Sequence, residues 1–216
     1  MHMIQMISAV AFATALLAAV TAAAVGLRTK KKKWKAAAGI CLLLCVFMAC
    51  LYFVLAVKQY SDFSLEETPE FAVTSPNLND GVWEPVITNT EYGQNRSPEL
   101  DWQEVPGTAV YVIYMLDSDA GNWMHMKAEN IAGTSLSEGG LPDDSYIGPY
   151  PPSGTHRYEI YVFALGQQKD TYPGQLDHVS AGIEELALLL DVRDDGAAGN
   201  VIAYGKLSGT YTHGDR

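Results

Sequence analysis

The chain has 216 residues, enough for one globular domain and an appendage, with 48% hydrophobic residues and a formal net charge of −11. Residues 1–60 contain seven of the 14 Lys and Arg and no Asp or Glu, so residues 61–216 carry a formal charge of −18. A surface this acidic repels phosphate backbones, which argues against nucleic acid as a partner.

Two apolar runs dominate the first sixty residues, one over residues 3–27 and one over residues 36–57. Each is long enough to span a membrane, because roughly 20 apolar residues in a helix cover the roughly 30 Å hydrocarbon core. We therefore expect two transmembrane helices. The alternatives are a single anchor or a cleavable signal peptide in the first run, although signal peptides carry their positive charge before the apolar run and here it follows.

The basic stretch RTKKKKWK, Arg28–Lys35, separates the two apolar runs. Short loops rich in Lys and Arg face the cytoplasm, so we expect a two-pass cell-membrane protein whose acidic domain lies on the extracytoplasmic side. Cys41, Cys45 and Cys50 all fall in the second run, which leaves the domain without a disulfide. The predicted parts are a first helix with its basic loop (1–35), a second helix (36–58), a linker (59–70) and the domain (71–212).

Short β-rich runs separated by Gly, Pro, Asn and Asp clusters fill the rest of the chain. The clearest cover residues 110–116, 158–165 and 200–211. Residues 182–191 are the one good helix candidate, because Ile183, Leu186, Leu189 and Leu190 recur at helical spacing. These patterns predict a mainly β fold, a β-sandwich with a helix near the C-terminus.

Polar and aromatic side chains gather where two of these runs meet loops. Asp117 and Asp119 follow the first run two residues apart, and can accept hydrogen bonds from loop amides or hold an imidazole protonated. His125 lies two residues after Trp123, so an extended backbone would place both on one face. His156 and Tyr158 repeat that spacing just after a rigid Gly/Pro loop, residues 148–154.

These polar and aromatic side chains are suited to binding a small anion, because imidazoles, a tyrosine and loop amides donate hydrogen bonds to oxygen-rich groups. We expect the neighbouring aspartates to raise the proton affinity of the histidines. A purely structural role for the acidic pair, accepting hydrogen bonds in a turn, is the alternative.

Three sequence blocks carry a resemblance to a known family: D-S-D at residues 117–119, W-M-H at 123–125 and G-P-Y-P-P-S-G-T-H-R-Y at 148–158. Together with N-R-S-P-E-L-D-W at 95–102, they resemble the phosphatidylethanolamine-binding protein family, which includes the Raf-kinase-inhibitor proteins and prokaryotic homologues. The resemblance runs from about residue 71 to residue 211. Three positions depart from the family pattern: Ser118 and Ala132 replace prolines, and Met126 replaces a tryptophan.

The resemblance implies a shallow, preformed cavity for phosphate-like or carboxylate-like groups. Its lining would comprise Asp117, Trp123, His125, Pro151, His156 and Tyr158, and we add Asp119 as a candidate. Arg157 is expected to face away from the cavity, since its neighbours in the strand point inward. Asn95, Ser97 and Trp102 are expected to hold a turn and the core.

The sequence favours a non-enzymatic binding or regulatory protein that captures a small anionic or phosphorylated ligand, and a partner protein is a further candidate. One alternative is an inhibitor of an extracytoplasmic enzyme such as a protease, using the Gly/Pro loop as a rigid contact surface. Another is a hydrolase that uses Asp117, Asp119 and the two histidines. No HExxH or GxSxG motif supports hydrolysis. We expect neither a metal nor another cofactor.

Overall fold

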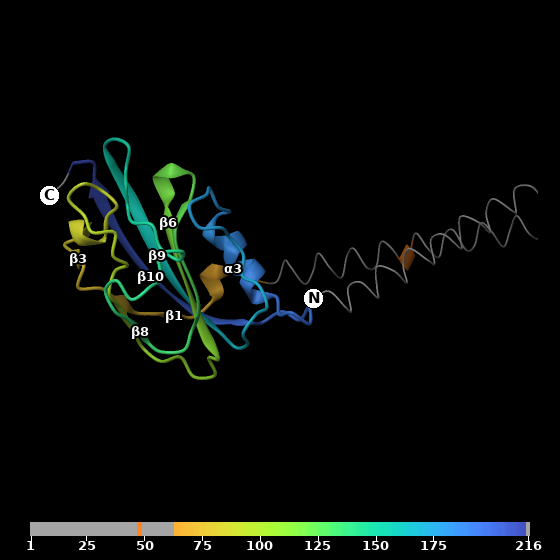
Figure 1. Ribbon diagram of the computed structural model, residues 1–216. Coiled ribbons are helices and arrows are strands. Elements are labelled where there is room, and N and C mark those ends of the chain that lie inside the picture. Colours follow the sequence, from red (N-terminus) through yellow and green to blue (C-terminus); the bar gives the residue numbers. More distant parts are fainter. Residues whose placement is uncertain (1–46, 49–62, 215–216) are drawn as a thin grey trace, which may run out of the picture. The chain divides into compact units, whose positions relative to one another are not determined.

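A computed structural model describes residues 47–48 and 63–214 of the chain (Figure 1). The chain divides into two units, residues 1–62 and residues 63–216. Apart from the helical residues Phe47 and Met48, both predicted transmembrane runs lie outside the described residues. Within the described ranges, no helix is both long enough and apolar enough to cross a membrane.

The second unit is built mainly from strands, arranged in two sheets. The larger sheet has seven strands in the order β3-β4-β10-β9-β6-β7, with β1 added in parallel to β10, and the smaller has the order β2-β5-β8. The strands are β1 (Glu70–Phe71), β2 (Val73–Thr74), β3 (Leu78–Asn79), β4 (Val82–Trp83), β5 (Leu100–Trp102), β6 (Val110–Asp117), β7 (Trp123–Ile131), β8 (Ser135–Leu136), β9 (Thr155–Leu165) and β10 (Val201–Thr212).

Within residues 63–214, one α-helix, α3 (Ile183–Asp191), accompanies three single-turn 3₁₀ helices. These are η1 (Leu65–Glu67), η2 (Pro85–Ile87) and η3 (Ser118–Ala120). Figure 1 shows α3 on one side of the large sheet and β8, in the small sheet, on the other. The result is three layers, with the large sheet buried on both faces.

Successive side chains of β6 point to opposite faces of the large sheet and so contribute to two hydrophobic cores, one on each side. Ile113 and Met115 join the cluster facing the small sheet, whereas Val112 and Tyr114 join the cluster beneath α3. Every residue of β6 is therefore buried. This double burial is why the sequence reads as a continuous apolar run rather than as an alternating one.

The three long predicted strands and the predicted helix are all present, with shifted boundaries. Strand β9 begins three residues earlier than expected, at Thr155, so His156 and Arg157 belong to the strand. The helix begins one residue later, at Ile183. Leu189 was expected on its apolar face but is 41% exposed, because the buried stripe runs through Leu186 and Leu190 instead.

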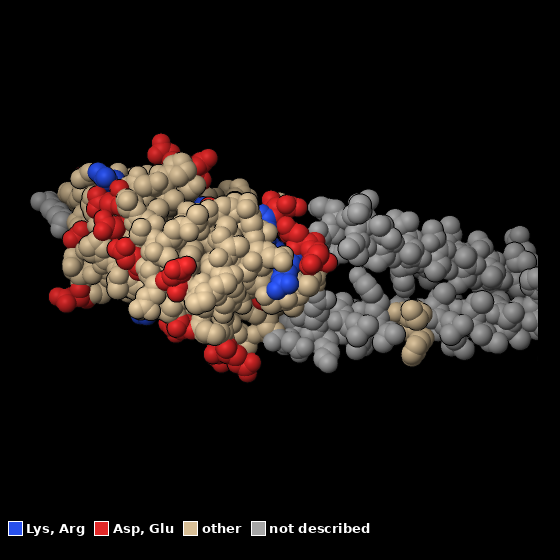
Figure 2. Space-filling view, turned by 90° about the horizontal axis from the view of Figure 1, so that it is seen from below, with Lys and Arg blue, Asp and Glu red and all other residues tan. Residues whose placement is uncertain are grey.

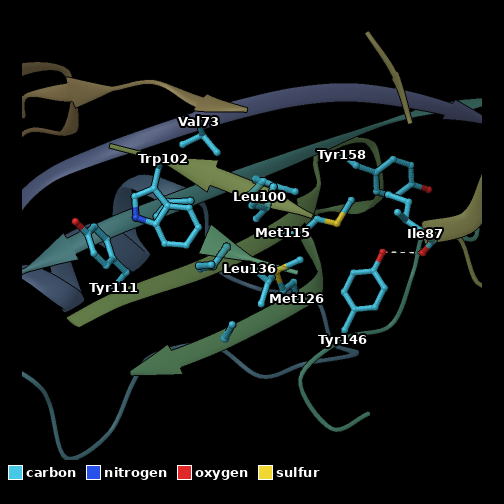
Figure 3. Close-up of a cluster of buried hydrophobic side chains, with 14 of the residues drawn as sticks. Val73, Ile87, Leu100, Trp102, Tyr111, Met115, Met126, Leu136, Tyr146 and Tyr158 are labelled. Atoms are coloured by element: carbon cyan, nitrogen blue, oxygen red, sulfur yellow. Dashed lines mark hydrogen bonds between the residues drawn. The ribbon is translucent and has the colours of Figure 1, made fainter. Parts of the chain in front are cut away.

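The core facing the small sheet includes Tyr146, which lies just before the Gly/Pro loop in the chain (Figure 3). Trp102 and Tyr111 meet edge to face with ring centroids 5.3 Å apart, and the buried Tyr146 hydroxyl donates a hydrogen bond to the Ile87 carbonyl at 2.7 Å. Asn95 accepts a bond from the Gly148 amide at 2.7 Å. The segment around η2 therefore supports the loop that leads into β9.

Candidate functional site

Asp117 occupies the centre of the candidate site, at the last position of β6. Trp123 in β7 and Tyr158 in β9 are its partners on the two neighbouring strands. One carboxylate oxygen accepts hydrogen bonds from the amides of Asp119 and Ala120, both at 3.0 Å, and so caps η3. The residue is only 2% exposed, so its charge is held inside the protein by these bonds and by the partner of its second oxygen.

That partner is His156, whose Nδ1 lies 2.7 Å from Asp117 Oδ2. A carboxylate oxygen can only accept here, so Nδ1 carries the hydrogen and donates it. Nε2 is then the ring nitrogen left for a ligand, as an acceptor when the imidazole is neutral and as a donor when it is protonated. The Asp117–His156 pair thus orients an imidazole from a buried anchor.

His125 occupies a β-bulge in β7. Met115 pairs with Met126 and Leu116 pairs with Met124, so His125 is the extra residue between them. Side chains in a regular strand alternate between the two faces of the sheet, and a bulge changes the direction of the side chain at the extra residue. The ring of His125 meets that of Tyr158 edge to face, with centroids 5.2 Å apart.

The His125 imidazole is held neutral rather than charged. Its Nδ1 donates to the Ile147 carbonyl at 2.7 Å, and burial lowers its pKa below the usual 6.5 even though the charge of Asp117 acts in the opposite direction. Asp117 raises the proton affinity of His125, as expected, but the effect of burial is larger and lowers the pKa overall. The cost of removing an imidazolium from water outweighs the attraction to the carboxylate.

Tyr158 lies between the two imidazoles. Its ring stacks against His156, with centroids 6.4 Å apart, in addition to the contact with His125. Tyr158 is fully buried, yet its hydroxyl has no hydrogen-bond partner among the described residues. Burial, followed by the charge of Asp117 and a contact with its carboxylate that falls short of hydrogen-bond geometry, raises the pKa of Tyr158, so the hydroxyl keeps its proton and can donate it.

The other three predicted residues surround this group less directly. The Asp119 carboxylate accepts from the Arg157 amide at 2.8 Å and so joins η3 to β9, a structural role. Trp123 is half-buried beside Asp117. Pro151 is buried, and its carbonyl accepts from His213 Nδ1 at 2.8 Å. Arg157 is exposed, as expected for a side chain facing away from the cluster.

Asp177 is a neighbour of the site that the sequence did not indicate. Its carboxylate accepts from Trp123 Nε1 at 3.3 Å, and its charge acts on the His125 imidazole. It stands in a loop without hydrophobic periodicity, at a left-handed φ of 62°, far along the chain from the motifs. An Asp followed by a His in a loop is not a pattern that indicates a functional site.

Three hollows of about 280, 350 and 480 Å³ occur on the surface of the described unit. None of the three is lined by the predicted site residues. The first is lined by Asn95 and Tyr146 among others, and so lies against the support of the Gly/Pro loop. Within residues 63–214 we also find no group of three or more His, Cys, Asp or Glu arranged to hold a metal ion.

Comparison with known proteins decides the family. The family model described as phosphatidylethanolamine-binding protein matches residues 74–212. The chain belongs to this family. An archaeal relative, a UPF0098 protein from Methanothermobacter thermautotrophicus, is 34% identical over 143 residues, which cover 56% of this chain and 86% of that protein.

Solved structures of family members are also similar. A putative phosphatidylethanolamine-binding protein homologue from Chlamydia trachomatis is 22% identical, with a TM-score of 0.49, over 67% of this chain and 98% of its own. The E. coli protein YbcL, described as a member of the mammalian family, is 25% identical, with a TM-score of 0.49, over 67% of this chain and 99% of its own. The family model and the archaeal relative confirm the resemblance inferred from the sequence blocks.

Proposed function

We propose that the domain is a non-enzymatic binding or regulatory module that captures a small anion, phosphate-like or carboxylate-like, at Asp117, His125, His156 and Tyr158. The observation that carries the proposal is the Tyr158 hydroxyl, which is buried without a partner among the described residues. A buried hydroxyl that makes no hydrogen bond costs about 1–3 kcal/mol. An anionic oxygen placed against it would accept that bond and remove the cost.

The two histidines contribute differently to such a site. His156 is oriented by Asp117, so its Nε2 can donate to an anion when the ring is protonated. His125 is neutral and its Nδ1 is already used, so its Nε2 is an acceptor suited to a protonated ligand oxygen such as the hydroxyl of monohydrogen phosphate. Anion binding would therefore favour the imidazolium form of His156 and the neutral form of His125.

Calorimetry tests this proposal with inorganic phosphate, acetate and phosphoethanolamine as probes. His156→Ala should weaken binding about tenfold or more, because a charge-assisted hydrogen bond is lost. His178→Ala is the matched control, since His178 is exposed in the loop beside Asp177. If none of the three probes binds, or if His156→Ala binds as tightly as the wild type, the proposal is wrong. Hydrolysis of phosphoethanolamine that depends on His156 would favour the hydrolase alternative.

We further propose that this module is tethered to the cell membrane on the extracytoplasmic side. The support is the distribution of charge, with a basic stretch at residues 28–35 between two apolar runs and an acidic remainder. An extracytoplasmic position would expose the module to soluble ligands and proteins outside the cell.

A further inference from the structure

Basic side chains are scarce on the domain. Residues 61–216 contain seven Lys and Arg against 25 Asp and Glu, and acidic groups predominate on the face seen in Figure 2. One of the seven, Arg96, lines a surface hollow of about 280 Å³ together with Gln94, Asn95 and Asp143. An arginine in the wall of a hollow can bind the oxygens of a ligand, because its planar N–H donors match those of a carboxylate.

Contacts with Glu138 and Gly139 hold the guanidinium of Arg96 in place. Its Nε lies 3.1 Å from a Glu138 carboxylate oxygen, and its Nη2 donates to the Glu138 carbonyl at 3.2 Å. The side-chain amide of Asn77 donates to the other Glu138 oxygen at 2.9 Å, so Glu138 is fixed as well. A Cβ atom at Gly139 would lie 2.9 Å from Arg96 Nε, so the glycine leaves room for the guanidinium. The arginine is positioned before any ligand arrives, which lowers the entropy lost on binding.

The donors on this side of the hollow are not all used. Arg96 Nη1 makes no hydrogen bond among the described residues. Asn95 accepts from the Gly148 amide through its side-chain oxygen at 2.7 Å, which leaves its Nδ2 group without a partner in residues 63–214. Three successive lining residues, 94–96, therefore end in amide or guanidinium groups, and at least two of them have N–H donors to spare. Such donors suit a carboxylate.

Asp143 adds a negative charge to the lining of the same hollow. Its carboxylate makes no hydrogen bond or ion pair with the part of the chain that the structure describes, whereas that of Glu138 is bound by both Arg96 and Asn77. A carboxylate without a partner attracts an ammonium group. The hollow thus combines spare donors on one segment with an unpaired carboxylate on another.

We propose that this hollow binds a small zwitterion of the amino-acid type, with its carboxylate on residues 94–96 and its ammonium group on Asp143. The local charges select this class. Arg96, Glu138 and Asp143 together carry a net negative charge, which repels a simple anion, and a simple cation would leave the donors unused. The volume of about 280 Å³ lies near the lower end of the range of small-molecule pockets, about 300–1,000 Å³, and so suits a small ligand.

This inference does not depend on the anion site. None of the groups proposed to bind the anion lines the hollow. Asn95 belongs to the hollow and also bonds to Gly148 in the Gly/Pro loop, so the two sites are neighbours of one loop and share no proposed ligand-binding group. Either proposal can therefore fail alone.

Saturation-transfer NMR on the full-length chain, purified in detergent, is the first step of the test. The probes are L-alanine and γ-aminobutyrate, which are zwitterions with different spacings of charge, and acetate and ethylammonium, which each carry one of the two charges. We expect at least one zwitterion to bind more tightly than either singly charged probe. If neither zwitterion binds, or if acetate or ethylammonium binds as tightly as the better zwitterion, the proposal is wrong.

Substitutions then locate the bound zwitterion. Arg96→Gln and Asp143→Asn should each weaken its binding about tenfold, since each removes one charge-assisted contact. Asp143→Asn breaks no bond among the described residues, so its fold should be intact, which circular dichroism checks. Arg157→Gln and Asp101→Asn, at exposed residues outside the hollow, are the matched controls and should bind as the wild type does. Wild-type affinity in Asp143→Asn, or a loss in His156→Ala instead, would overturn the proposal.

Discussion

Gly148 shows how a single residue positions the Gly/Pro loop. A Cβ atom at this glycine would lie 2.2 Å from the Ile87 carbonyl oxygen and 2.8 Å from the Asn89 amide nitrogen. Both are backbone atoms, so they cannot rotate out of the way. The glycine is required because two backbone segments approach closely, one carrying η2 and the other leading to β9.

Gly148→Ala should therefore destabilise the domain by about 1–3 kcal/mol, the range for forcing an extra carbon into a packed site. Gly133→Ala is the matched control, because a Cβ there meets nothing within 4 Å. Its free energy of unfolding should stay within about 0.5 kcal/mol of wild type. Urea unfolding of both variants measures the difference, and an undisturbed Gly148→Ala protein would show that the loop is not packed as described.

His125 should make folding stability depend on pH. Burial lowers its pKa in the folded state below the 6.5 of the unfolded chain, so the unfolded chain takes up the proton first as the pH falls. The contribution of His125 to stability is thus complete above about pH 6.5, and is lost as the pH drops from there through the folded-state pKa.

Urea unfolding at several pH values between about 7.5 and 5.5, the window that brackets the usual histidine pKa, measures this loss. His125→Gln should flatten the dependence, whereas His178→Gln, at an exposed histidine, should keep the wild-type slope. A folded-state pKa of His125 at or above 6.5, measured by NMR titration, would contradict this explanation.

At the scale of elements, α3 covers its face of the large sheet mainly through Leu186 and Leu190, which are 1% and 0% exposed. Leu186→Ala should cost about 2–5 kcal/mol, because it removes buried apolar atoms and leaves a cavity. Leu189→Ala, on the same helix but 41% exposed, should cost less than about 1 kcal/mol. Equal losses of stability in thermal unfolding would mean that the helix presents a different face to the sheet.

The long elements were predictable from the sequence and the short ones were not. β6 and β9 are continuous apolar runs because both faces of the large sheet are covered. Such a run can be recognised in the sequence without knowing which strands pair with it. Strands of two residues such as β3 and β8 are too short to show a period. The bulge at His125 depends on how β7 pairs with β6, so no local pattern could have indicated it.

The sequence predicted that the residues at the centre of the candidate site come together. It did not predict the charge state of His125 or the presence of Asp177. Asp117, His156 and Tyr158 meet because two strand ends lie side by side, which the family motifs implied. The neutral state of His125 depends on its depth of burial, and Asp177 depends on the path of a loop. Both are properties of the folded chain that spacing in the sequence does not encode.

At the scale of the whole molecule, the charge distribution predicts that the domain lies outside the membrane and the basic stretch at residues 28–35 inside. Protease added to intact cells should then remove the domain, or to spheroplasts if the cell has an outer membrane. A domain protected in such cells but cleaved after permeabilisation would show the opposite orientation.

We propose that the buried Tyr158 hydroxyl donates to the bound anion, and Tyr158→Phe tests this by removing that hydroxyl alone. The free energy of unfolding without ligand should stay the same or rise by up to about 1 kcal/mol, because an unsatisfied polar atom is lost. The affinity for phosphate, measured by calorimetry on the same protein, should fall about tenfold, the loss of one hydrogen bond to a charged group. Unchanged phosphate affinity in a folded Tyr158→Phe protein would show that this hydroxyl does not bind the anion.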